Sequence, residues 1–273
     1  MVDITINTVV ARQILTGFIR SEVTRVGFSR VVVGLSGGLD SALSFALAVE
    51  ALGPENVLAV RMPYRLSSSD SLAHAQLMID QYKTPNETIE ITDMVEPLFK
   101  RDPQITKLRM GNAMARARMI VLYDQSEAFK GLVLGTSNKT EILLGYSTLW
   151  GDMASAINPI GDLYKTQARQ LSSALGVPAP IIDKPPSADL WEGQTDENEL
   201  GFTYEQVDRL LYLLVDHRYS PQECIEDGFD PKFVNAVTTR VRRNQFKRMM
   251  PPIAKLSNRT IGYDFLYLRD WGT

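Results

Sequence analysis

The sequence predicts an α/β protein whose core is a doubly wound parallel sheet with helices on both faces. Two observations predict this class. Short apolar runs rich in valine and leucine alternate with longer segments in which apolar residues recur at helical spacing. The chain also has 273 residues and is 44% hydrophobic, so it can bury a substantial core. We therefore expect residues 1–273 to form a single domain that binds ligands at the carboxyl ends of its strands.

The predicted elements of the first half alternate regularly. Runs of β-branched residues predict the strands, and helical spacing of apolar residues predicts the helices. In chain order we expect a helix at 4–26, a strand at 31–35, a helix at 41–52, a strand at 57–62, a helix at 69–82, a strand at 88–91, a long helix at 107–130 and a strand at 132–134.

The second half has a different character. Residues 151–202 are rich in Gly, Pro, Asp and Ser, and a long irregular segment of this kind is more often functional than structural. Helices are expected at 203–217 and 231–250. The aromatic-rich end, "LSNRTIGYDFLYLRDWGT", is expected to pack on the body of the protein or to cross to a partner subunit.

The amino-acid composition limits which binding partners and which cellular compartment are expected. The 29 basic residues balance 32 acidic ones, so neither a nucleic acid nor a membrane surface is expected as a partner. No apolar stretch is long enough to span a bilayer, and the first residues lack the pattern of a signal peptide. Cys224 is the only cysteine, which fits a reducing, cytoplasmic environment and argues against a Cys/His zinc site. No basic residue lies near it in the sequence, so we interpret Cys224 as a buried apolar residue.

The stretch "VVVGLSGGLDSALSFALAVEAL", residues 31–52, joins a predicted strand to a predicted helix through two glycines. Glycines let backbone N–H groups approach a ligand closely, and the helix N-terminus adds unpaired amides and a positive dipole. Together they form an anion site suited to phosphate, to which the hydroxyls of Ser36 and Ser41 contribute. The alternative is a simple glycine turn with Asp40 or Ser41 as the helix N-cap.

Asp40 indicates which kind of phosphate site this is. A carboxylate repels a phosphate unless a cation bridges the two, and Mg²⁺ binds through one or two carboxylates plus phosphate oxygens. Asp40 is therefore a predicted Mg²⁺ ligand. The string is neither a Walker A loop nor the dinucleotide fingerprint G-x-G-x-x-G.

The string S-G-G-x-D-S resembles the pyrophosphatase loop of the N-type ATP pyrophosphatases, whose fold is Rossmann-like and of the adenine nucleotide alpha hydrolase type. Further segments narrow the resemblance. In order they are "GNAMARARM" (111–119), "GTSNKTEILLGYSTLWGD" (135–152), "NPIGDLYKTQ" (158–167), "KPPSADLWEGQTDENELGFTYEQVD" (184–208) and "FKRMMPP" (246–252). From about residue 12 to its end the chain resembles ammonia-dependent NAD⁺ synthetase.

The resemblance implies a carbon–nitrogen ligase that catalyses the final step of NAD⁺ biosynthesis. ATP adenylates the nicotinate carboxylate of deamido-NAD⁺ and releases pyrophosphate. Ammonia then attacks the acyl-adenylate and yields the amide and AMP. The family's glutamine-dependent relatives add a large glutaminase domain for which this chain has no room, so free ammonia or a separate ammonia donor is expected. The resemblance also implies a homodimer.

The resemblance further implies roles for individual residues. ATP is expected at Gly34, Leu35, Ser36, Gly37, Gly38, Leu39, Asp40, Ser41, Thr136, Lys165 and Ser187. Mg²⁺ is expected at Asp40 and Glu141, and deamido-NAD⁺ at Arg116, Tyr146, Phe246 and Lys247. The implied catalytic residues are Asp40, Lys165 and Asp152.

Some of these residues have a second interpretation. Asp152 is expected to attract ammonium and to take a proton as the amine forms, but it could equally be a turn residue after Gly151. Glu141 could be a solvated loop acid, and Tyr146 a packed tyrosine. Met62 lies where the family's adenine binds, or in the core.

Two positions depart from part of the family. Leu149 stands where some members have Lys, and Ala156 stands where they have Asp. Both lie on the nicotinate side, so they weaken the assignment of individual substrate contacts there more than the assignment of the reaction.

Three alternatives stay open at this point. Another enzyme with the same loop, GMP synthetase-like or tRNA-modifying, would share the phosphate chemistry. A non-catalytic ATP-binding regulatory protein would keep the loop but would not need both Asp40 and Glu141. The stretch "RVRRNQFKR" places Arg240, Arg243 and Lys247 on one helical face, which indicates a nucleic-acid contact or a solvated face.

Overall fold

The computed structural model describes residues 2–187, 196 and 200–262. Its centre is a parallel sheet of four strands in the order β3-β2-β1-β4. The strands are β1 Val31–Gly34, β2 Val57–Arg61, β3 Asn86–Thr88 and β4 Leu132–Leu134. β1 is central and pairs in parallel with β2 on one side and β4 on the other. The prediction of a parallel α/β sheet is confirmed.

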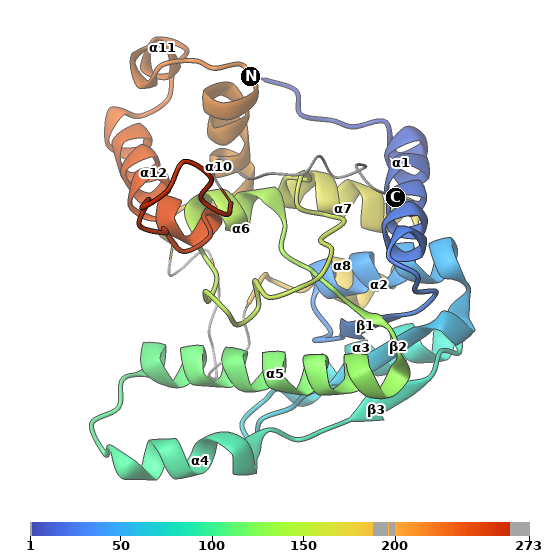
Figure 1. Cartoon of the computed structure of the whole chain (residues 1–273). Coiled ribbons are helices and arrows are strands. Elements are labelled where there is room, and N and C mark those ends of the chain that lie inside the picture. The colour runs from blue at the N-terminus through green and yellow to red at the C-terminus, as the bar shows by residue number, and fades with distance from the viewer. Residues whose placement is uncertain (1, 188–195, 197–199, 263–273) are drawn as a thin grey trace.

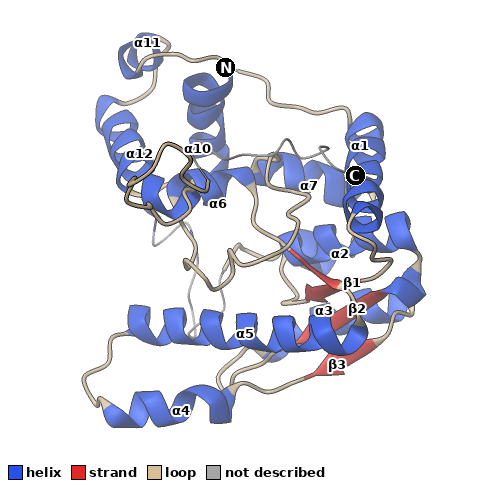
Figure 2. Cartoon of the chain, viewed as in Figure 1, coloured by secondary structure: helices blue, strands red, loops and turns tan. Residues whose placement is uncertain are grey.

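The alternation of side chains along β1 explains why helices cover both faces. Val31 and Val33 are fully buried on one face, where they join the core formed with α1 Thr8–Arg25, α2 Leu39–Leu52, α3 Ser69–Tyr82 and α7 Lys165–Ala174. Val32 points to the other face and packs with residues of α4 Thr92–Arg101 and α5 Lys107–Phe129. Figure 1 shows α5 and α4 on one side of the sheet and α1, α2 and α7 on the other. In Figure 2 the short strands lie between α5 and α2.

The second half of the chain builds a separate core beside the sheet. It contains α6 Lys139–Leu144, α10 Tyr204–Leu211, α11 Pro221–Glu226 and α12 Pro231–Arg243, with a π-helical turn at Tyr212–Asp216. Leu144, Val207 and Val237 are fully buried in this core. In Figure 1 α10, α11 and α12 group together, and α6 and α7 lie between them and the sheet. α6 follows the carboxyl end of β4 and so brings this core to that edge of the sheet.

Several predicted boundaries were wrong, for local reasons. α1 begins at Thr8 rather than at residue 4, because the side chain of Asn7 accepts a hydrogen bond from the N–H of Val10 and caps the helix there. β3 occupies 86–88 rather than 88–91. The helix predicted at 231–250 ends at Arg243 and continues as a 3₁₀ turn at Gln245–Arg248. The helix predicted at 203–217 loses its regular form in the π-helical turn.

The structure also contains helices where the sequence predicted none. The segment 151–202, expected to be irregular, contains α7 and the short helix α8 Ala179–Ile182. Ala168 and Leu171, three residues apart, bury the apolar side of α7, while its other positions are mostly polar. α4 and α6 were likewise not predicted. The part of the aromatic-rich tail at 263–273 lies outside the described residues.

Every helix within the described ranges is too short or too polar to cross a bilayer.

Cys224 is expected to resist alkylation in the native protein. Its side chain is fully buried in α11, which raises the pKa of the thiol, and the carboxylates of Asp227 and Glu223 raise it further. The thiolate is the reactive form, so labelling by a maleimide should be slow even at pH 8 and complete only after denaturation. Since the chain has one cysteine, labelled mass reports the site directly. Rapid stoichiometric labelling of the folded protein would contradict this interpretation.

Candidate active site

A cavity of about 590 Å³ opens where β1, β2 and β4 end. Gly34 ends β1 and is followed by Leu35 and Ser36, Met62 follows β2, and Thr136 follows β4; all of them line the cavity. The carboxyl ends of parallel strands form one edge of the sheet, so loops that are distant in sequence converge there. The N-terminal ends of α2, α6 and α7 also contribute lining residues, namely Asp40, Glu141 and Lys165.

The glycine loop folds tightly between β1 and α2. Ser41 Oγ donates to the carbonyl of Gly38 at 2.9 Å and lies 3.0 Å from Ser36 Oγ. The N–H of Leu35 still pairs with the carbonyl of Val60, so the loop begins only after the sheet ends. The hydroxyls thus hold the loop in shape, and Asp40 stands in the first turn of α2.

Gly37→Ala is expected to disrupt this loop. Gly37 has a φ of 78°, and a Cβ atom there would lie 2.1 Å from the carbonyl oxygen of Ser71 in α3. Backbone strain of this kind costs about 1–3 kcal/mol, and the overlap with a backbone atom adds to it. We expect a lower free energy of unfolding, measured by urea denaturation. Gly38→Ala is the control, because its Cβ would meet only Ser36 Oγ, at 3.4 Å. Equal effects of the two variants would contradict the close packing of Gly37.

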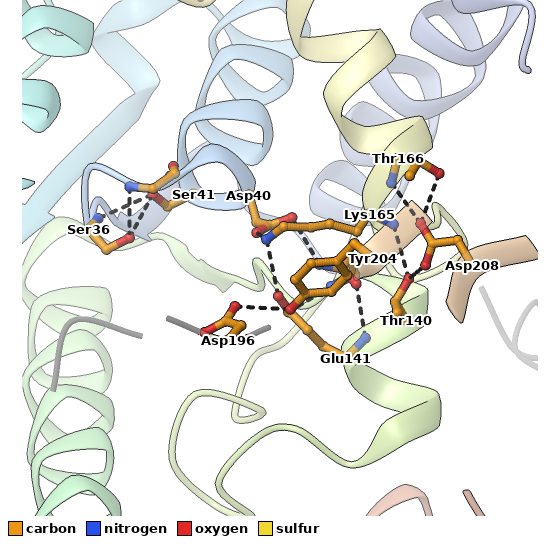
Figure 3. A network of polar contacts seen from close by, with 12 residues as sticks. Ser36, Asp40, Ser41, Thr140, Glu141, Lys165, Thr166, Asp196, Tyr204 and Asp208 are labelled. Atoms are coloured by element: carbon orange, nitrogen blue, oxygen red, sulfur yellow. Dashed lines mark hydrogen bonds and ion pairs between the residues drawn. The ribbon is translucent and has the colours of Figure 1, made fainter. Parts of the chain in front are cut away.

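Lys165 lies at the centre of the polar cluster shown in Figure 3. Its ammonium forms an ion pair with Asp40 Oδ2 and lies 3.4 Å from Glu141 Oε1. Asn138 fixes both acids: its side-chain amide donates to Asp40 Oδ1 at 3.0 Å, and its backbone N–H donates to Glu141 Oε2 at 3.3 Å. The structure thus brings together Asp40, Glu141 and Lys165, which the sequence assigned separately to metal and phosphate binding.

The electrostatics of the cluster follow from its burial. The Lys165 side chain is only 6% exposed. Burial alone lowers the pKa of Lys165, but the charges of Asp40 and Glu141 outweigh it, and the pKa is raised. The pKa of Glu141 is raised to about 8: burial is the largest cause, the charge of Asp40 raises it as well, and Lys165 opposes the rise. The ammonium is therefore the charge that allows two acids to share this site.

A third acid, Asp196, is close enough for its charge to act on Lys165. It accepts a hydrogen bond from the hydroxyl of Tyr204 at 2.9 Å, and the Lys165 ammonium lies 5.2 Å from the centre of the Tyr204 ring. Sequence reasoning did not single out Asp196 or Asn138. Asn138 precedes Glu141 in "NKTE", a motif in which only Glu141 was assigned, and Asp196 belongs to the quoted segment "TDENELG", in which no residue was assigned. Most of "TDENELG" lies outside the described residues.

The remaining predicted residues divide into two groups. Thr136, Tyr146, Asp152, Ser187 and Lys247 line the cavity with the glycine loop, as does Met62. Arg116 and Phe246 are exposed and are not among the lining residues; Arg116 donates to the carbonyl of Leu149 at 3.2 Å. Asp152 accepts a hydrogen bond from the N–H of Thr148 at 2.6 Å, so it also closes a turn.

The basic stretch 240–248 has a structural function that the sequence did not indicate. Lys247 Nζ donates to the carbonyls of Gly145 and Ser147, both at 2.7 Å. Arg248 donates to the carbonyls of Ile142 and Leu143, and Arg240 and Asn244 donate to that of Leu144. These side chains satisfy the carbonyls at the C-terminal end of α6, where positive charge is favourable. The segment thus holds the helix that carries Glu141.

Comparison with known proteins identifies the family. A family model described as NAD synthase matches residues 11–251. The chain belongs to this family. It is 56% identical, over 272 residues that cover all of both chains, to an NH₃-dependent NAD⁺ synthetase of Trichlorobacter lovleyi.

Solved structures agree in fold. The chain resembles an NH₃-dependent NAD synthetase from Campylobacter jejuni in complex with the nitrate ion, with a TM-score of 0.79 and 34% identity over 92% of this chain and all of that one. It also resembles an NMN synthetase from Francisella tularensis, with a TM-score of 0.81 and 30% identity over 91% and 99% of the two chains. The predicted Rossmann-like fold of the adenine nucleotide alpha hydrolase type is confirmed.

Proposed function

We propose that the protein is an ammonia-dependent NAD⁺ synthetase that converts deamido-NAD⁺ to NAD⁺ at the expense of ATP. The nicotinate carboxylate attacks the α-phosphate of ATP and forms an acyl-adenylate and pyrophosphate. Ammonia then displaces AMP from the acyl carbon. The observation that carries the proposal is the buried Asp40–Lys165–Glu141 cluster beside the glycine loop, in a chain that belongs to the NAD synthase family.

The chain's own residues have defined tasks in this reaction. The amides and hydroxyls of the loop from Gly34 to Ser41 hold the phosphates, and Thr136 and Ser187, which line the same cavity, contact the nucleotide as well. Lys165 supplies positive charge where pyrophosphate departs. Catalysis in phosphoryl and adenylyl transfer rests mostly on charge neutralisation and alignment, for which a rigid, buried ammonium is suited.

Asp40 and Glu141 fit a Mg²⁺ ion. Their carboxylate oxygens are hard donors, and they already enclose one cation, the Lys165 ammonium. Among the described residues no group of three or more His, Cys, Asp or Glu is arranged to hold a metal. Two carboxylates suffice for Mg²⁺, because the nucleotide phosphates complete its coordination. The ion would supply charge neutralisation for the phosphates.

For the dinucleotide we propose Tyr146 and Lys247 as contacts within the cavity, and Arg116 and Phe246 at its outer rim. Asp152 attracts ammonium and takes a proton as the amide forms. Leu149 and Ala156 leave this side without the charges that some relatives carry there. We further propose a cytoplasmic homodimer in which each chain acts as one domain, with free ammonia or a separate ammonia donor as the nitrogen source.

The test is an omission assay. The purified protein is incubated with ATP, Mg²⁺, ammonium and deamido-NAD⁺, and NAD⁺ is followed with a coupled dehydrogenase. We expect NAD⁺ only when all four components are present, with one pyrophosphate released for each NAD⁺. Glutamine in place of ammonium should give little product.

A parallel assay replaces deamido-NAD⁺ with nicotinate mononucleotide, because one similar structure is that of an NMN synthetase. We expect the dinucleotide to be the better substrate. A higher kcat/KM for the mononucleotide would overturn the substrate assignment, and ATP cleavage without either acceptor would overturn the reaction.

A further inference from the structure

Helix α7, which carries Lys165 at its first position, is capped only in part by its own residues. Tyr164 occupies the N-cap position without a side-chain capping hydrogen bond, and Gln167 Oε1, in the first turn, accepts a hydrogen bond from the N–H of Tyr164 at 3.0 Å. Asp208, in α10, caps a further amide of the first turn. Its Oδ2 accepts hydrogen bonds from the N–H and the hydroxyl of Thr166, both at 2.8 Å. Part of the cap of α7 thus comes from a residue 42 positions away from Thr166 in the chain.

The same carboxylate also holds α6, the helix of Glu141. Asp208 Oδ1 accepts a hydrogen bond from Thr140 Oγ1 at 2.5 Å, and Thr140 Oγ1 in turn accepts one from the N–H of Lys165 at 3.0 Å. Thr140 precedes Glu141 and Thr166 follows Lys165 in the chain. Figure 3 shows Asp208 between the two threonines, on the side of Lys165 away from the glycine loop.

Burying a carboxylate at the contact between α6, α7 and α10 costs free energy that packing alone does not require. Asp208 and Thr140 are both fully buried. Burial raises the pKa of Asp208, and the bonds from Thr140 and Thr166 oppose the rise. Replacing buried ionic groups with well-packed apolar ones is often neutral or stabilising, so packing alone does not require a carboxylate here. A carboxylate with three donors does impose direction, because each hydrogen bond fixes the position of one backbone segment.

We propose that Asp208 is a positioning residue that sets the Lys165 ammonium and the Glu141 carboxylate at their mutual distance before the nucleotide binds. The proposal rests on the functions proposed above for Lys165 and Glu141. Asp208 acts through Thr140 and Thr166 and does not itself line the cavity. A displacement of about 1 Å in a catalytic group can cost about a hundredfold in rate, so a residue of this kind can matter without touching substrate.

Two pairs of variants test the proposal. Thr140→Val keeps the shape of the side chain and removes the hydroxyl, whereas Thr140→Ser keeps the hydroxyl. Asp208→Asn removes the charge. Val207→Ala changes the preceding position of α10, which is equally buried; it removes packing contacts and leaves the hydrogen-bond network intact. For each variant kcat, KM for ATP and the urea midpoint are measured, and hydrogen exchange is followed at the Lys165 and Thr166 amides.

We expect Asp208→Asn and Thr140→Val to lower kcat about 10- to 100-fold and to speed exchange at those two amides. Thr140→Ser and Val207→Ala should keep kcat within about threefold of the wild-type value. This should hold even if their urea midpoints fall as far as those of Thr140→Val and Asp208→Asn. The double variant Asp208→Asn/Thr140→Val should be no slower than the worse single variant, because both act through one chain of bonds.

The proposal is overturned if Thr140→Val and Thr140→Ser have the same kcat. It is also overturned if kcat falls in proportion to the urea midpoint across all four variants. Lys165→Met and Glu141→Gln separate its failure from that of the site assignment. If these two variants keep wild-type kcat, the proposed functions of Lys165 and Glu141 are wrong and the inference falls with them. If they lose activity while Asp208→Asn does not, the inference alone is wrong.

Discussion

Lys165→Met is expected to remove NAD⁺ synthesis almost completely and to destabilise the fold. The substitution keeps an unbranched side chain, one atom shorter, and deletes the charge that two buried acids share. One electrostatic contact to a reacting group is worth about 10²–10³ in rate. Removing one partner of a buried ion pair also costs about 3–5 kcal/mol, because the remaining charges are left uncompensated. The measurements are kcat for NAD⁺ formation and the free energy of unfolding in urea.

Lys139→Met is the matched control. Its ammonium is also held by two acids, Asp162 at 3.0 Å and Asp216 at 2.8 Å, and it begins the helix that carries Glu141. It does not line the cavity. We expect it to lose stability and to keep kcat within a few-fold of wild type. If both lysine variants lost activity equally, the loss would reflect damage to α6, and the assignment of Lys165 to the phosphates would be wrong.

Asp40→Asn is expected to have the second largest effect. The amide keeps the shape of the side chain and can still accept the hydrogen bond from Asn138, but it no longer neutralises a cation. We expect kcat to fall about 10²–10³-fold, and the Mg²⁺ concentration for half-maximal activity to rise, because a carboxylate ligand is lost. Stability should fall less than in Lys165→Met, since Glu141 remains to pair with the ammonium.

The experiment is a Mg²⁺ titration of pyrophosphate release at saturating ATP and deamido-NAD⁺. Glu50→Gln is the control, because Glu50 belongs to the same helix, α2, and pairs with Arg12 at 2.7 Å on the surface. It should leave the titration unchanged. An unshifted Mg²⁺ midpoint in Asp40→Asn would show that Asp40 serves Lys165 alone and is not a metal ligand.

Much of the fold was predictable because its cause is local. The β-branched run before Gly34 and the apolar content of α2 predict a buried strand and helix, and the glycines between them predict the phosphate loop. α7 was missed because most of its residues are polar, Tyr164 is not a capping residue, and the apolar contact that stabilises it depends on Ala168 and Leu171 meeting α2. The sequence of α7 alone does not show that these two residues contact α2.

The functional residues divide in the same way. Asp40 was predicted from the chemistry of its glycine loop, and Glu141 and Lys165 from the resemblance of their motifs to those of the family. That they form one buried cluster depends on the sheet, which brings the ends of β1 and β4 together, and on α7. The attachment of Lys247 to carbonyls just after α6, and of Asp208 to the starts of α6 and α7, depends on contacts between residues 42 to 102 positions apart. Short sequence patterns show which chemical groups the chain contains. Folding brings donors and acceptors that are distant in the sequence within hydrogen-bonding distance. The tertiary structure therefore decides which of these groups hold the site in place.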